Sequence, residues 1–65
     1  MLIQLNGEQR EITPKTVLGL LDSLGIDPKR VAVELNMEIL PKAEYAAKTI
    51  ADGDRIEIVH FVGGG

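Results

Sequence analysis

The residues with the clearest chemical potential are three consecutive glycines, Gly63, Gly64 and Gly65, with the carboxylate that we expect on Gly65. Glycine has no Cβ and tolerates almost any backbone conformation, so we expect a flexible tail over residues 62–65. Four extended residues span about 13 Å at roughly 3.3 Å each, enough to carry a carboxylate into a partner's active site through a narrow channel. The pattern favours the Gly65 carboxylate as the reactive group, with Gly63 and Gly64 as its tail.

Few other residues support catalysis. Cysteine is absent, which excludes disulfides, thiolate metal sites and thiol nucleophiles. His60 is the single histidine, so we expect no zinc site, and a lone histidine without a partner is more often structural or solvent-facing than a general base. In 65 residues a substrate cavity of about 300 Å³ or more is hard to form. We therefore expect a protein that is not an enzyme and binds no metal or cofactor.

The net charge and the hydropathy pattern of the sequence argue against some classes of binding partner. The net charge of −3 argues against nucleic acid, which requires a basic face. No apolar run approaches the roughly 18 residues that cross a membrane, and no signal-peptide pattern opens the chain, so we expect a cytoplasmic protein with no membrane partner. The acidic side chains, Glu34, Asp52, Asp54 and Glu57 among them, either steer a basic partner or form an ordinary solvated face.

The first half of the chain reads as a hairpin followed by a helix. Residues 1–5 alternate as a strand, Asn6-Gly7 is a two-residue turn, and residues 8–12 form a polar return strand near a sheet edge. Thr16 is a good N-cap for a helix whose apolar stripe runs to Leu24, and Gly25 ends it. Gly19 inside this helix implies the close approach of another part of the chain.

The second half predicts strands around a short connection. Residues 31–35 form a strand, residues 38–40 a short extended piece, and residues 41–49 a helical turn or an irregular loop that carries Tyr45 inward. A turn at residues 51–54 leads to the last strand, residues 55–61.

We place the last strand beside the first, parallel to it, in the centre of a mixed sheet packed on one main helix. This α+β arrangement is the ubiquitin-like β-grasp, and we expect it to form one domain over residues 1–65. With Ile56 and Ile58 facing the core, alternation turns Val59 and Phe61 outward beside the tail. These two residues and Val62 are the predicted partner-binding positions, although singly exposed apolar side chains are common.

Taken in order, several short motifs give a resemblance to the ThiS family, the sulfur carriers of thiamine (thiazole) biosynthesis. They are Asn6-Gly7-Glu8, Thr16-Val17 with Leu20-Leu21, Val33-Glu34-Leu35-Asn36, Pro41, Asp52-Gly53-Asp54-Arg55-Ile56-Glu57-Ile58, and Val59-His60-Phe61-Val62-Gly63-Gly64-Gly65. The resemblance covers the whole chain. Met37 departs from it, because relatives often place glycine after the asparagine. Since a non-glycine residue at positive φ is disfavoured, we expect a different type of turn at Asn36-Met37.

The resemblance implies a carrier and not a catalyst. In such families an E1-like adenylating enzyme uses Mg-ATP to activate the terminal carboxylate, here on Gly65. Sulfur from a persulfide donor then replaces AMP to give a thiocarboxylate, and thiazole synthase takes the sulfur. Two alternatives stay open. The chain could resemble the molybdopterin-synthase small subunit or a related ubiquitin-like modifier, or it could be a non-covalent β-grasp interaction module whose glycines are incidental.

Overall fold

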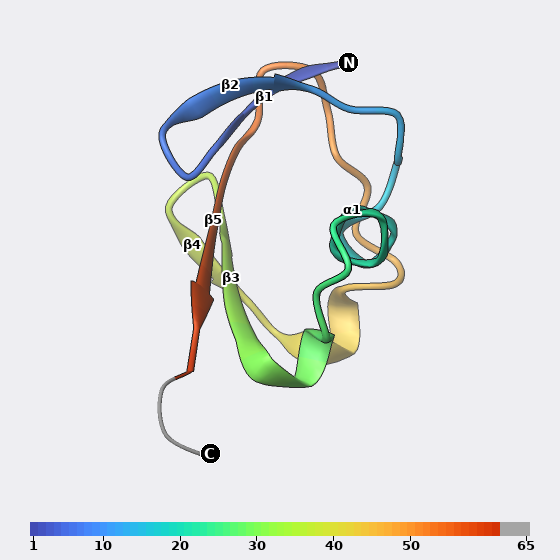
Figure 1. Ribbon diagram of the computed structural model, residues 1–65, viewed down its shortest axis with the longest axis vertical. Coiled ribbons are helices and arrows are strands. Elements are labelled where there is room, and N and C mark those ends of the chain that lie inside the picture. Colours follow the sequence, from blue (N-terminus) through green and yellow to red (C-terminus); the bar gives the residue numbers. More distant parts are fainter. Residues whose placement is uncertain (62–65) are drawn as a thin grey trace.

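A computed structural model describes residues 1–61, and the predicted tail, residues 62–65, lies outside the described residues. The elements follow the predicted succession of hairpin, helix, strand, short connection and last strand, and the extended piece at residues 38–40 is itself a strand (Figure 1). They are β1 (Leu2–Leu5), β2 (Glu8–Glu11), α1 (Val17–Ser23), the 3₁₀ turn η1 (Pro28–Arg30), β3 (Val31–Leu35), β4 (Glu38–Leu40), the 3₁₀ turn η2 (Lys42–Glu44) and β5 (Arg55–His60).

The five strands found within residues 1–61 form one mixed sheet in the order β2-β1-β5-β3-β4. β5 lies in its centre and runs parallel to β1, with Gln4 opposite Arg55 and Leu5 opposite Ile56. The remaining pairs are antiparallel, and β2 is an edge strand as predicted. α1 lies across one face of this sheet (Figure 1). The predicted α+β, ubiquitin-like β-grasp is therefore confirmed.

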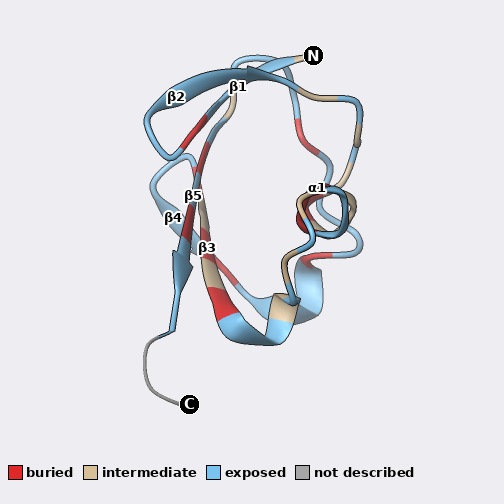
Figure 2. Cartoon of the chain, viewed as in Figure 1, coloured by how far each residue is buried: buried red, intermediate tan, exposed pale blue. Residues whose placement is uncertain are grey.

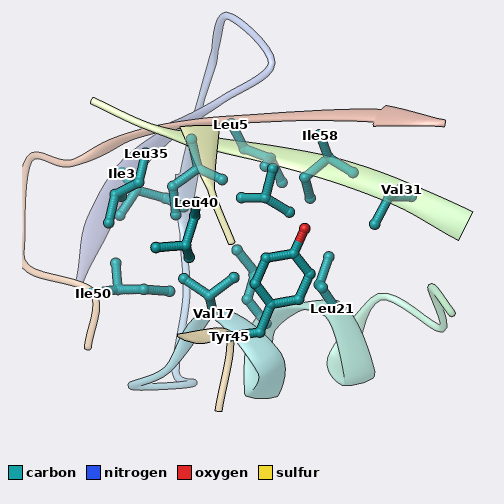
Figure 3. Close-up of a cluster of buried hydrophobic side chains, with 13 residues drawn as sticks. Ile3, Leu5, Val17, Leu21, Val31, Leu35, Leu40, Tyr45, Ile50 and Ile58 are labelled. Atoms are coloured by element: carbon teal, nitrogen blue, oxygen red, sulfur yellow. The ribbon is translucent and has the colours of Figure 1, made fainter. Parts of the chain in front are cut away.

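An aliphatic core fills the space between the sheet and α1 (Figures 2 and 3). Ile56 and Ile58 of β5 face this core, which confirms the predicted phase of the strand. The connection begins with the 3₁₀ turn η2, so the helical-turn interpretation is the one that holds, and Tyr45 just after it is only 2% exposed. The core residues are Ile3, Leu5, Val17, Leu20, Leu21, Val31, Val33, Leu35, Leu40, Tyr45, Ile50, Ile56 and Ile58.

The short helix α1 is held by caps at both ends. The Thr16 hydroxyl accepts a hydrogen bond from the Gly19 N–H at 3.1 Å, as expected of an N-cap. At the other end Gly25 has φ of +70°, and the Ile26 N–H donates to the Leu21 carbonyl, which closes a Schellman motif. A Cβ on Gly19 would lie 3.1 Å from the Thr16 hydroxyl oxygen, so the N-cap itself explains this glycine.

The turn between β3 and β4 differs from our expectation. Asn36 and Met37 both have positive φ, +52° and +72°, and they match Asn6 and Gly7 of the first hairpin, at +49° and +83°. Our prediction of another turn type at Met37 is wrong. A two-residue hairpin whose central residues both have positive φ follows the right-handed twist of its strands, and this demand outweighs the local preference of methionine.

Candidate functional site at the end of strand β5

β5 leads from the centre of the sheet toward the predicted tail (Figure 1). The side chain of Val59, on β5, is 53% exposed, and that of Phe61, which follows the strand, is 52% exposed. They therefore face away from the core, as the alternation predicts. Val62, the third predicted partner-binding residue, lies outside the described residues together with Gly63, Gly64 and Gly65.

Phe61 is held although half of its surface is exposed. Its N–H donates to the Arg30 carbonyl at 2.9 Å, which extends the β3–β5 pairing by one bond beyond the end of the strand. The Lys42 ammonium lies 4.9 Å from the centroid of the Phe61 ring, within the range of a cation–π contact. The same ammonium donates to the Lys29 carbonyl at 3.0 Å. The residue that precedes the predicted tail thus has a defined place.

The open face of the sheet beside Phe61 combines apolar and acidic side chains. Val59 lies opposite Ala32 on β3, and in the next outward-facing pair Glu57 lies opposite Glu34. Neither glutamate forms an ion pair within residues 1–61. Like charges directly opposite one another on a sheet are mildly destabilising, so this pair contributes nothing to the stability of the fold.

Two other predicted acidic residues have structural roles. The Asp52 carboxylate accepts a hydrogen bond from the Leu2 N–H, and Asp54 accepts from the Ala51 N–H at 2.8 Å and from the Asn36 side chain at 3.0 Å. Asn36 in turn accepts from the Arg55 N–H at 2.9 Å. These bonds build the turn that starts β5, which gives Asp52 and Asp54 a role independent of any partner.

His60 is exposed at the end of β5, opposite Val31. No hydrogen bond to its imidazole ring is found within residues 1–61, so no described group orients it as a general base. The ring therefore lies in solvent, which was the favoured interpretation of the sequence.

The surface of residues 1–61 carries an open hollow. It measures about 520 Å³ and lies between the β2 edge and α1, lined by Leu5, Ile12, Pro14, Leu20 and Leu24 among others. This open depression is not an enclosed substrate cavity, so it does not bear on the size limit argued from chain length. Its titratable lining groups are Arg10 and Glu11, and its lining includes no residue of β5.

Residues 1–61 were also compared with the requirements of a metal site and of a membrane-spanning helix. Nowhere in residues 1–61 do three His, Asp or Glu side chains gather as a metal site. In the same residues no helix has the length and hydropathy needed to cross a membrane, α1 being seven residues long.

Two residues that support this end of β5 were not singled out from the sequence. Lys42 is 19 positions from the ring it contacts, and its own segment gives no local sign of that contact. Asn6 was assigned only to its turn, yet its side chain accepts from the Ile58 N–H at 2.7 Å and donates to the Ile58 carbonyl at 3.2 Å. Both contacts depend on the assembled sheet, so no local sequence pattern could have found them.

Comparison with known proteins identifies the family. The model of the ThiS family matches residues 3–65. A thiazole synthase of Paramagnetospirillum magneticum is 50% identical over 66 residues, covering 100% of this chain. The chain spans only 20% of the length of that protein. The sulfur carrier protein ThiS of Bacillus subtilis is 44% identical over 66 residues, covering 98% of this chain and 100% of that protein.

A solved structure agrees with the sequence relatives. The thiamine biosynthesis protein (ThiS) of Geobacter metallireducens superposes with a TM-score of 0.86 at 35% identity, covering 100% of both chains. The family model, the full-length relative and the solved structure all carry the name ThiS, and the solved structure is described as a thiamine biosynthesis protein. The chain belongs to the ThiS family of sulfur carrier proteins of thiamine biosynthesis.

Proposed function

We propose that this chain carries sulfur as a thiocarboxylate on Gly65 and delivers it to thiazole synthase. The observation that carries the proposal is the run Gly63-Gly64-Gly65, separated from the central strand β5 only by Phe61 and Val62, in a member of a sulfur-carrier family. The relatives named thiazole synthase, in which a matching segment occupies about a fifth of the protein, favour that enzyme as the acceptor. We place the reactions in the cytoplasm.

The first step is activation of the carboxylate. A carboxylate oxygen is a poor leaving group, so an E1-like adenylating enzyme joins the Gly65 carboxylate to the α-phosphate of Mg-ATP and releases pyrophosphate. The mixed anhydride then has AMP as its leaving group. Side chains at positions 63 and 64 would move the carbonyl from its reacting position, and a displacement of about 1 Å can lower a rate on the order of 100-fold.

The second step introduces sulfur. The terminal sulfur of a donor persulfide attacks the Gly65 carbonyl, AMP leaves, and an acyl disulfide forms. A second thiol then attacks the S–S bond, which leaves the thiocarboxylate on this chain and a disulfide on the partner. This chain has no cysteine, so both sulfur atoms must come from partners.

Partner binding is assigned to Val59 and Phe61, which are exposed, and to Val62, the first residue of the predicted tail. Val59 tests this without disturbing the core, because it is 53% exposed. Val59→Asn should weaken binding to the adenylating enzyme about fivefold or more, as expected for truncation of an interface apolar contact. Leu2→Asn, at a residue 41% exposed on β1, is the matched control and should bind normally. Equal binding by both variants would remove Val59 from the interface.

The carrier role is tested by ATP–pyrophosphate exchange with the adenylating enzyme. Intact mass first verifies that Gly65 is the last residue of the protein used. Deletion of Gly65 should abolish exchange, and Gly64→Ala and Gly64→Leu should lower it in order of side-chain size. Lys48→Met, a change at an exposed lysine, is the control and should exchange normally. Exchange that survives deletion of Gly65 would exclude the carrier role and leave the interaction module.

The product is tested by mass spectrometry of the C-terminal peptide after incubation with the adenylating enzyme, ATP and the persulfide donor. Intact mass alone is insufficient, because oxidation of Met1 or Met37 adds nearly the same mass as exchange of oxygen for sulfur. Fragmentation should locate the added mass on Gly65, and omission of ATP should abolish it. An unmodified Gly65 in the presence of active partners would contradict the proposal.

A further inference from the structure

Consecutive carbonyl groups of η1 accept hydrogen bonds from Phe61, just after β5, and from Lys42 of η2. The Arg30 carbonyl accepts from the Phe61 N–H at 2.9 Å, and the Lys29 carbonyl accepts from the Lys42 ammonium at 3.0 Å. The same ammonium lies 4.9 Å from the centroid of the Phe61 aromatic ring, which links Lys42 back to Phe61. We call this set, Lys29, Arg30, Lys42 and Phe61, the β5 latch. In Figure 1, η1 and η2 lie at the end of the molecule where β5 ends.

The hydrogen bond to Arg30 and the cation–π contact with Lys42 restrain different parts of Phe61. The backbone bond to Arg30 holds the Phe61 peptide but leaves its side chain free to rotate. The Lys42 ammonium restricts that rotation, because a cation is attracted to the face of an aromatic ring and not to its edge. Lys42 is itself held by its bond to Lys29, so its charge is fixed over the ring.

A stability role alone does not account for this arrangement. Lys42 and Phe61 are both exposed, and the core between the sheet and α1 includes neither of them. The latch fixes instead the last described residue before the predicted tail. Ordering a segment before it binds lowers the entropy that binding must remove, so a held Phe61 favours docking.

We propose that Lys42 is a positioning residue for docking of this chain: its ammonium, anchored on Lys29, holds the Phe61 ring in the orientation that contacts the adenylating enzyme. This inference rests on the proposed carrier function. Lys42 acts through Phe61 and does not touch the reacting carboxylate. Its loss should therefore raise the KM for this chain and leave kcat unchanged.

The size of the effect follows from the contact. An exposed cation–π pair corresponds to about a two- to fivefold change in an equilibrium. Lys42→Met should raise the KM of ATP–pyrophosphate exchange by about that factor. Lys42→Arg should restore the KM, because a guanidinium also stacks on aromatic rings and donates to carbonyls. Lys48→Met, at an exposed lysine with no side-chain hydrogen bond in residues 1–61, is the matched control.

A double-mutant cycle separates positioning from direct contact with the enzyme. Phe61→Leu keeps an apolar side chain but removes the aromatic ring. If Lys42 acts through the ring, Lys42→Met should have no further effect on KM in the Phe61→Leu background. Multiplicative effects of the two changes, or an unchanged KM in Lys42→Met, would overturn the proposal.

A measurement without the enzyme checks the latch itself. The Lys42 Hε protons should be shifted upfield in the NMR spectrum by the ring current of Phe61, and the shift should disappear in Phe61→Leu. Absence of the shift in the unsubstituted chain would also overturn the proposal. Absence of any exchange with the unsubstituted chain would instead refute the carrier function, and the ring-current shift distinguishes these two failures.

Discussion

Replacement of Asn6 tests how the centre of the sheet is completed. β1 pairs with β5 through only two residue pairs, and at Asn6 the chain turns away into β2. Without the Asn6 side chain, the Ile58 N–H and carbonyl would lack hydrogen-bond partners on the side of β5 that faces β1. The Asn6 side chain is the partner of both groups: it accepts from the Ile58 N–H at 2.7 Å and donates to the Ile58 carbonyl at 3.2 Å. Its side-chain amide thus continues the pairing of β1 with β5 where the backbone of β1 has turned away.

The expected loss of stability has two parts. Each of the two hydrogen bonds contributes about 1 kcal/mol net, so Asn6→Gly should lower the free energy of unfolding by about 2 kcal/mol. Asn6 also has φ of +49°, where alanine is disfavoured by roughly 1 kcal/mol and glycine is not. Asn6→Ala should therefore lose about 3 kcal/mol, a large share of the roughly 3–10 kcal/mol expected for a domain of this size.

Urea unfolding followed by far-UV circular dichroism measures both values. With a slope of about 1 kcal/mol/M, the midpoint should fall by about 2 M for Asn6→Gly and about 3 M for Asn6→Ala. Gln9→Ala changes an exposed residue of the same hairpin with no side-chain hydrogen bond in residues 1–61, and should leave the midpoint within about 0.5 M. An Asn6→Gly variant as stable as the unsubstituted chain would refute the role of the amide. Equal midpoints for glycine and alanine would refute the strain argument.

Three further substitutions test the core, the helix cap and the second hairpin in the same assay. Leu20→Ala, at a side chain 1% exposed, should lose about 2–5 kcal/mol through the cavity it leaves, and a loss under about 1 kcal/mol would contradict the packing. Gly19→Ala should give no net gain, because the new Cβ crowds the Thr16 hydroxyl, whereas the usual alanine gain of about 1 kcal/mol should reappear in a Thr16→Ala background. Met37→Gly should stabilise by about 1 kcal/mol, since Met37 is 75% exposed at φ of +72°; destabilisation would mean that its side chain packs usefully.

Much of the fold could be predicted from local signals. Asn6-Gly7 requires a tight turn, Thr16 and Gly25 bound the helix, and the alternation around Ile56 and Ile58 sets which face of β5 is buried. Each of these features depends on residues within a few positions of one another, where steric limits and hydrogen bonding act directly on the chain. The exposure of Val59 and Phe61 follows from the same alternation. Their role with the glycine tail stays a prediction.

The contacts that hold the end of β5 depended on the tertiary structure. The bonds between Asn6 and Ile58, and the placement of Lys42 over Phe61, join residues 52 and 19 positions apart. Met37 adopts positive φ because the twist of two paired strands outweighs its own preference. Local sequence determined the helices, the strands and their buried faces, because steric limits and hydrogen bonds between neighbouring residues set the conformational energies of these elements. Only the assembled sheet decided which distant side chains complete it, since those partners meet only when the strands have paired.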